Sequence, residues 1–192
     1  NYIQRDVFYN SDGSLKQVEF DGEMGVAIHN QNKGTAYILG YTVNYLGKIS
    51  KTINMSGFIT YTKGRTYDTN EPMSSIPPLF GQFEVSYKKE RVALGAEFRF
   101  NSRKDIKDFN ITEGIDNHDL TPVIDATATT GEARYYGTPS WLTFGVNAGY
   151  ELNNSISVQA RLDNVFDVHY MEFASGVSSP GRNLSVSFVA NF

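Results

Sequence analysis

The sequence predicts an all-β protein, an antiparallel transmembrane β-barrel, from two observations. From residue 35 onward, most of the chain consists of short segments in which apolar and polar residues alternate. Such a segment forms a strand with one apolar and one polar face. The connections between these segments alternate between long and short, and outer-membrane barrels combine tight periplasmic turns with long extracellular loops.

The alternation defines about eight strands, at residues 1–8, 35–46, 51–62, 80–87, 91–100, 141–151, 155–163 and 182–192. Every strand from residue 35 onward has an apolar face. Leu94 and Phe98 lie on that face in 91–100, and Val146 lies on it in 141–151. Residues 9–33 form a polar, turn-rich connection with room for a short strand at 15–20.

The predicted connections repeat one rhythm. Long connections at 9–33, 63–79, 101–140 and 164–181 alternate with short ones at 47–50, 88–90 and 152–154. Counting back from a periplasmic C-terminus places every long connection outside the cell. A soluble β-sandwich or jelly roll explains the alternation of side chains but not this rhythm, which favours the membrane barrel.

The last strand and the composition support the same fold class. The strand 182–192 ends in Phe192, which fits the aromatic girdle of a membrane barrel. The 192 residues include no Cys, which excludes a thiolate metal site, and the net charge of −4 argues against a nucleic-acid partner. No apolar run is long enough for a transmembrane helix. The chain begins in strand-like sequence, as expected of a piece of a longer protein.

The polar faces of the strands carry the candidate lumen-facing residues. These are Glu97, Arg99, Asn147, Gln159, Arg161 and Asp163. They could form a charged network inside a narrow closed barrel, or they could line part of a wider lumen. Periodicity alone leaves both arrangements open.

A set of motifs near the C-terminus resembles the signature of TonB-dependent outer-membrane receptors. The family pattern is Asn-Leu-Phe-Asp-x-x-Tyr, then Pro-Gly-Arg, then a closing strand that ends in an aromatic residue. The matching residues here are Asn164, Phe166, Asp167, Tyr170, Pro180, Gly181, Arg182 and Phe192. Val165, where Leu is common in the family, departs from the pattern. Residues 32–40, Gly64 and 76–78 resemble further family motifs, in the family's order.

The same motif residues have a local physical interpretation. Asn164 and Asp167 can cap a turn with their side chains, and Phe166 can pack against the barrel wall. Pro180 ends the loop outside the strand ladder because it has no N–H, and Gly181 permits a bend into the strand.

The resemblance implies that the chain is the last part, about eight strands, of a barrel of about 22 strands. The N-terminal plug, the TonB-contacting region and the earlier strands would then be absent from residues 1–192. The family imports a scarce substrate, such as an iron-siderophore, haem, cobalamin or a glycan, across the outer membrane with energy from TonB. The implied partners are outer-membrane lipid, the TonB complex and a small-molecule substrate, and no cofactor is implied.

Two other functions remain as alternatives. One is a small closed outer-membrane barrel with a structural or adhesive role. The other is an outer-membrane hydrolase, which the sequence disfavours because it has no Gly-x-Ser-x-Gly motif. We therefore predict no catalytic residues and no enzyme activity.

The sequence contains no convincing metal site. His29, His118 and His169 lie in or beside long connections without a second ligand at a useful spacing. The acidic residues of 101–140 lack the spacing of a calcium loop.

Aromatic residues gather near the bases of the long loops. We interpret them as girdle anchors at the membrane interface, with stacking on a ligand as the alternative. They are Tyr135, Tyr136, Trp141, Tyr170 and Phe173.

Overall fold

The structure is a computed structural model that describes residues 2–128 and 131–191. The chain divides into two compact units. One, which we call the loop unit, gathers residues 1–39, 62–76 and 104–138, and the other, the sheet unit, gathers residues 40–61, 77–103 and 139–192. Strands make up 54% of the chain and helix 3%, so the prediction of an all-β fold is confirmed.

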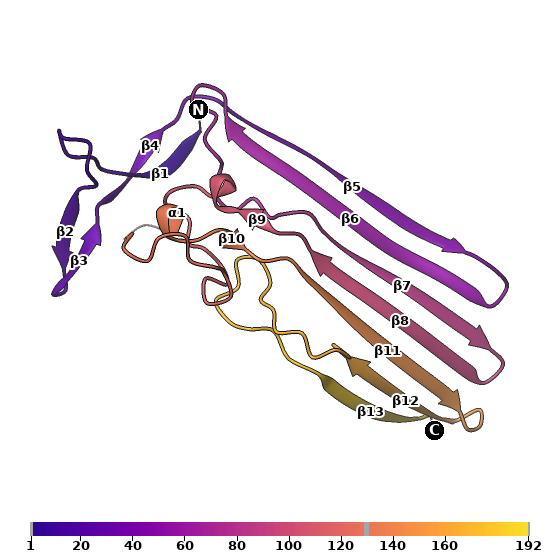
Figure 1. Ribbon diagram of the computed structural model, residues 1–192. Helices are drawn as coiled ribbons and strands as arrows, with labels where there is room; N and C mark the ends of the chain where they lie inside the picture. The colour runs from indigo at the N-terminus through magenta and orange to yellow at the C-terminus, as the bar shows by residue number, and fades with distance from the viewer. Residues whose placement is uncertain (1, 129–130, 192) are drawn as a thin grey trace. The chain divides into compact units, whose positions relative to one another are not determined.

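A seven-stranded sheet is the largest element of the structure (Figure 1). Its order is β13-β12-β11-β8-β7-β6-β5, so strands that follow one another in the chain lie side by side. The strands are β5 (Ala36–Lys48), β6 (Ile53–Thr66), β7 (Phe80–Lys89), β8 (Val92–Asn101), β11 (Trp141–Glu151), β12 (Ile156–Asp163) and β13 (Asn183–Ala190).

The register of the sheet confirms the predicted faces. Residues directly opposite each other in an antiparallel pair point to the same face. One row across five strands is entirely apolar and consists of Val85, Ala96, Val146, Leu162 and Leu184. The neighbouring row on the other face consists of Ser86, Gly95, Asn147, Arg161 and Ser185. The sheet therefore has one apolar and one polar face.

The sheet is open within the described residues. β5 and β13 each have a neighbour on one side only, and every residue of β13 is exposed. Both strands leave backbone N–H and C=O groups without a ladder partner, and such edges invite pairing with further strands.

The N-terminal segment differs from the prediction. The strand predicted at 1–8 forms β1 (Ile3–Val7), which pairs with β4 (Ile28–Asn32) and not with the large sheet. Its burial explains the difference, because Gln4 and Val7 are buried while Ile3 is exposed. β1 therefore has no continuous apolar face to add to the sheet.

The connection predicted at 9–33 also contains more structure than expected. It holds a second ribbon, β2 (Gln17–Phe20) with β3 (Glu23–Val26), besides β4. The turn between β2 and β3 uses Asp21 and Gly22, both with positive φ, as a two-residue hairpin turn requires.

The rhythm of long and short connections is confirmed within the seven-stranded sheet. The short turns are 49–52, 90–91 and 152–155, and the long connections are 67–79, 102–140 and 164–182. β6 continues to Thr66, beyond the predicted end at residue 62. Residues 102–140 contain β9 (Lys104–Asp105), η1 (Ile106–Asp108), α1 (Gly131–Arg134) and β10 (Gly137–Thr138). Among the described residues, no helix has the length and apolar character needed to cross a membrane.

Close packing at Gly81 provides a test of the sheet. A Cβ atom at Gly81 would lie 2.5 Å from the carbonyl oxygen of Phe58 and 2.8 Å from the Phe100 ring. Gly81→Ala should therefore lower the free energy of unfolding by about 1–3 kcal/mol. Gly149→Ala is the matched control, because its nearest neighbour would be 3.6 Å away. Urea unfolding of the full-length protein in lipid vesicles measures both, and equal stability of the two variants would contradict this packing.

Candidate functional site

Three of the predicted lumen-facing residues form one charged network on the polar face of the sheet unit. Arg161 donates from Nε to Oδ1 of Asp163 at 2.6 Å and from Nη2 to Oε1 of Glu97 at 3.3 Å. Gln82 donates from Nε2 to Oε2 of Glu97 at 3.0 Å. β7, β8 and β12 thus contribute to the same network, in which the single guanidinium of Arg161 is shared by two carboxylates.

Arg99 lies on the same face but pairs with a loop. Its Nη2 atom donates to Oε1 of Glu172 at 2.5 Å. Glu172 belongs to the connection 164–182 and was not among the predicted site residues. The two residues are 73 positions apart, so neither strand periodicity nor a local motif indicated the pair.

The other two predicted lumen-facing residues lie outside this group of ion pairs. The side chain of Asn147 covers Gly95, where an added Cβ would come within 2.5 Å of Asn147 Nδ2. Gln159 is exposed opposite Gly149. Gly95 on the neighbouring strand therefore makes room for the side chain of Asn147.

Trp141 and Tyr170 form an aromatic pair on the polar face. Their ring centroids are 4.3 Å apart, and Tyr170 is 6% exposed. Trp141 is opposite Asn101 in the register, and therefore points to the face that carries Arg99 and Thr143. The interpretation of Trp141 and Tyr170 as membrane girdle anchors was wrong for this reason, because they lie away from the apolar face.

A pocket of about 270 Å³ lies at the long-connection end of the sheet unit. Its aromatic walls include Phe58, Phe80, Trp141 and Phe173, and its polar groups include Gln82, Arg99 and Glu172. A second hollow of about 250 Å³, with a more polar lining, contains Glu97, Arg99, Arg161, Asp163 and Tyr170. Arg99 borders both. Concave sites with apolar walls and a few polar groups are typical of small-molecule binding.

The C-terminal motif forms a compact hydrogen-bonded turn in the sheet unit. Asn164 donates from Nδ2 to the carbonyl oxygens of Val168 at 2.9 Å and Pro180 at 3.4 Å, and its Oδ1 accepts from the Val168 N–H at 2.9 Å. Asp167 Oδ1 accepts from the backbone N–H of Arg182 at 2.7 Å. These bonds fasten the end of β12 to the start of β13.

The remaining motif residues lie around this turn. Asn164 and Asp167 both have positive φ, 47° and 56°, a conformation that Asn and Asp adopt more readily than most residues. Phe166 is 73% exposed, and its ring lies 6.0 Å from that of Phe144 on the apolar face. A Cβ at Gly181 would lie 2.7 Å from Asp167 Oδ1. Phe192 lies outside the described residues.

Replacement of Asn164 separates its hydrogen bonds from its backbone conformation. Asn164→Gly keeps the positive φ but removes the side-chain bonds, and should lower the free energy of unfolding by about 1–3 kcal/mol. Asn164→Ala should lower it further, because it adds the strain of a positive φ. Urea unfolding in vesicles measures both variants. A Gly variant as stable as the wild type would mean that the motif requires Asn164 for its backbone alone.

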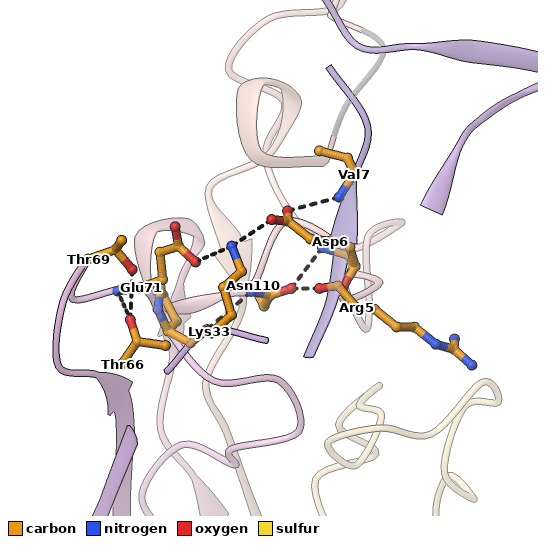
Figure 2. Close-up of polar contacts among 10 residues, drawn as sticks. Arg5, Asp6, Val7, Lys33, Thr66, Thr69, Glu71 and Asn110 are labelled. Carbon is orange, nitrogen blue, oxygen red and sulfur yellow. Dashed lines mark hydrogen bonds and ion pairs between the residues drawn. The ribbon is translucent and has the colours of Figure 1, made fainter. Parts of the chain in front are cut away.

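Polar contacts also join separate segments within the loop unit (Figure 2). Lys33 Nζ donates to Oδ2 of Asp6 at 2.6 Å and pairs with Oε2 of Glu71 at 3.0 Å. The backbone N–H of Glu71 donates to Thr66 Oγ1 at 2.9 Å. Lys33 therefore joins the N-terminal strands to the connection that follows β6.

A third segment joins the same unit through Asn110 and Lys104. Asn110 donates from Nδ2 to the carbonyl oxygen of Pro72 at 3.2 Å. The buried Lys104 pairs with Oε2 of Glu113 at 3.2 Å and lies 4.1 Å from the centre of the Phe109 ring. Burial lowers the pKa of Lys104, and the negative charge of Glu113 opposes this shift only in part.

Lys33 provides a test of the loop unit. Burial lowers the pKa of Lys33, but hydrogen bonds to Asp6 and Glu71 raise it, and the net pKa lies above the ordinary value. The stabilisation is therefore present up to the ordinary lysine pKa and is lost only as pH rises through the raised value. Lys33→Met should destabilise the loop unit by about 1–3 kcal/mol.

The measurement is the rate at which proteinase K cleaves residues 67–75 of the full-length protein. Lys33→Met should accelerate cleavage, whereas the matched change at exposed Lys63 should not. In the wild type the rate relative to an unstructured reference peptide should be the same at pH 7 and pH 9, because Lys33 stays charged. A rise between those pH values would contradict the raised pKa of Lys33, and equal cleavage of Lys33→Met and wild type would show that Lys33 does not hold the segments together.

The three histidines lie in different surroundings. His29 stacks on Phe8 with ring centroids 4.0 Å apart, and His169 Nε2 hydrogen-bonds Ser178 Oγ at 2.8 Å. His118 has Tyr135 as a ring neighbour at 5.9 Å. Across residues 2–128 and 131–191, no group of three His, Cys, Asp or Glu side chains could hold a metal ion.

Comparison with known proteins gives a match at the level of the fold. No protein-family model matches the chain, and no curated protein matches it in sequence. Among solved structures, the copper transporter OprC matches 93% of the chain with a TM-score of 0.62 at 18% identity. The ferric enterobactin receptor PfeA from Pseudomonas aeruginosa matches 100% with a TM-score of 0.62 at 17% identity.

A third solved structure, the siderophore receptor PirA from Acinetobacter baumannii, matches 100% of the chain with a TM-score of 0.61 at 17% identity. The chain spans 26–27% of the length of each of these three proteins. The matching structures are TonB-dependent outer-membrane receptors, so the fold of this chain is that of part of their barrel. By their descriptions these proteins are receptors and a transporter.

Proposed function

We propose that this chain is the C-terminal part of the barrel of a TonB-dependent outer-membrane receptor. In this proposal the plug, the region that contacts TonB and the earlier strands lie in another part of the protein. The receptor binds a scarce small molecule at its extracellular side and imports it with energy from TonB. The apolar face of the sheet contacts lipid, and the C-terminus is periplasmic.

The open seven-stranded sheet is the observation that supports this proposal most directly. Lipid offers no hydrogen-bond partners to exposed backbone groups, so a sheet that crosses a membrane must continue until it closes. The edges at β5 and β13 therefore favour a larger barrel over a small closed one. The C-terminal motif and the match to receptor barrels favour the same family.

The polar face supports a role as the wall of a lumen. In the proposed orientation, Glu97, Arg99, Asn147, Gln159, Arg161 and Asp163 face the lumen. The pocket beside Arg99 then lies near the extracellular side, because Trp141 and Asn101 are at the strand ends next to connection 102–140. A substrate held there would be within reach of the loops and of a plug.

Whole-cell labelling tests the proposed topology. Single cysteines at Asn70, Asp116 and Ser175, in the three long connections, should react on intact cells with a membrane-impermeant maleimide. Cysteines at Lys89 and Asn153, at the short turns, should react only after the outer membrane is permeabilised. These turns are periplasmic in the proposal, so the reagent cannot reach them from outside.

Heat-modifiable gel mobility provides the control that each variant is assembled. If the cysteines at Lys89 and Asn153 react on intact cells and those in the long connections do not, the orientation in the membrane is the reverse of the one proposed. Equal labelling of all five positions before permeabilisation would contradict the proposal that the chain forms part of a membrane barrel. The proposed function would then fail as well.

A further inference from the structure

The Arg99–Glu172 pair has features of a displaceable contact. The pair joins a strand to a loop, and the two side chains are 37% and 50% exposed. A guanidinium presents donors that match any planar anion, not only the carboxylate of a neighbouring residue. Because the pair is half exposed, its own stabilisation is small, and an external anion can compete for Arg99.

The surroundings of Arg99 provide more than charge. The pocket that contains Arg99 and Glu172 has ring faces from Phe58, Phe80 and Trp141. The indole Nε1–H of Trp141 is buried, and none of the described residues accepts a hydrogen bond from it. Because this N–H is buried, the groups that the pocket itself offers are a cation and apolar walls, whereas its acidic group already belongs to the chain.

We propose that this pocket binds a ligand with an anionic group on a flat apolar body, and that Glu172 occupies the position of that anionic group when the ligand is absent. This inference rests on the proposed function, because it assigns a substrate subsite of the same receptor. The ligand's anion pairs with Arg99, and its ring packs against the aromatic walls. Glu172 then leaves the pocket.

Displacement of Glu172 changes the loop as well as the pocket. The backbone N–H of Ser179 donates to the carbonyl oxygen of Tyr170 at 2.9 Å, and the ring of Tyr170 stays in contact with that of Trp141. These contacts close a small loop at residues 171–178 whose base is fixed. Release of Glu172 therefore removes one contact between this loop and the sheet without breaking the bonds of the turn at Asn164. The contact couples occupancy of the pocket to the position of an extracellular loop.

The proposal predicts opposite effects for the two members of the pair. Loss of the internal competitor makes more molecules competent to bind, so Glu172→Gln should increase the affinity for an anion, by about tenfold. Arg99→Gln should abolish binding, and Arg99→Lys should weaken it because the planar fork is lost. If the Arg99–Glu172 pair has no role in ligand binding, all three variants should have the same affinity for the anion as the wild type.

The experiment is a calorimetric titration of the detergent-purified full-length protein with benzoate. Benzylamine, which has the same ring and the opposite charge, and acetate, which has no ring, are the controls. Benzoate should bind, benzylamine should not, and acetate should bind more weakly than benzoate. A cysteine at Ser175 should react faster with maleimide when benzoate is present, and should react fast without benzoate in Glu172→Gln.

Several outcomes would overturn the proposal. These are no benzoate binding to either wild type or Glu172→Gln, equal binding of benzylamine, or a loss of affinity in Glu172→Gln. Heat-modifiable gel mobility confirms that each variant is assembled. If Arg99→Gln does not assemble, the affinity of Arg99→Lys for benzoate tests the role of Arg99 instead. If whole-cell labelling supports the topology and benzoate does not bind, only this inference fails. If the labelling contradicts the topology, the proposed function fails first.

Discussion

The separation of an apolar and a polar face is the constraint on which the rest of the structure depends. Backbone hydrogen bonds hold the seven strands together, but the register decides which side chains share a face. A slip of one residue in any strand would exchange its two faces. The rows through Val146 and Asn147 are consistent across neighbouring strands. In a membrane such a slip would bring Arg161 or Glu97 against lipid, at a cost of roughly 2–4 kcal/mol for an arginine at the midplane.

The same constraint explains why the fold could be predicted and where the prediction failed. Alternation is a local property, so strands such as 91–100 and 141–151 were recognisable, and their observed bounds lie within about one residue of those predicted. β1 and β4 lack a continuous apolar face, and their pairing joins Ile3 to Asn32. Nothing in either segment alone indicates its partner, because the ladder depends on contacts between distant residues.

The residues of the candidate site also fall into those that the sequence predicted and those that it did not. The polar faces identified Glu97, Arg99, Arg161 and Asp163 because each lies in phase with its strand. Glu172 was not identified, because a loop residue has no phase and its contact with Arg99 joins residues 73 positions apart. The Asn164 motif was recognised as a turn, but its role in fastening β12 to β13 depends on the bond between Asp167 and the Arg182 N–H. Short motifs indicate local conformation, and longer-range bonds determine what that conformation holds in place.

Trp141 shows that strand phase also decides the role of an aromatic residue at a strand end. An aromatic residue near a loop base suggested a girdle anchor, yet Leu142, Phe144 and Val146 already define the apolar phase of β11. Residue 141 is out of phase with them, so its ring points to the polar face. There the ring lies against that of Tyr170, and no acceptor for its buried Nε1–H is found among the residues that the structure describes. The phase was readable from the sequence, and it separates the residues on the apolar face of the sheet from those on its polar face.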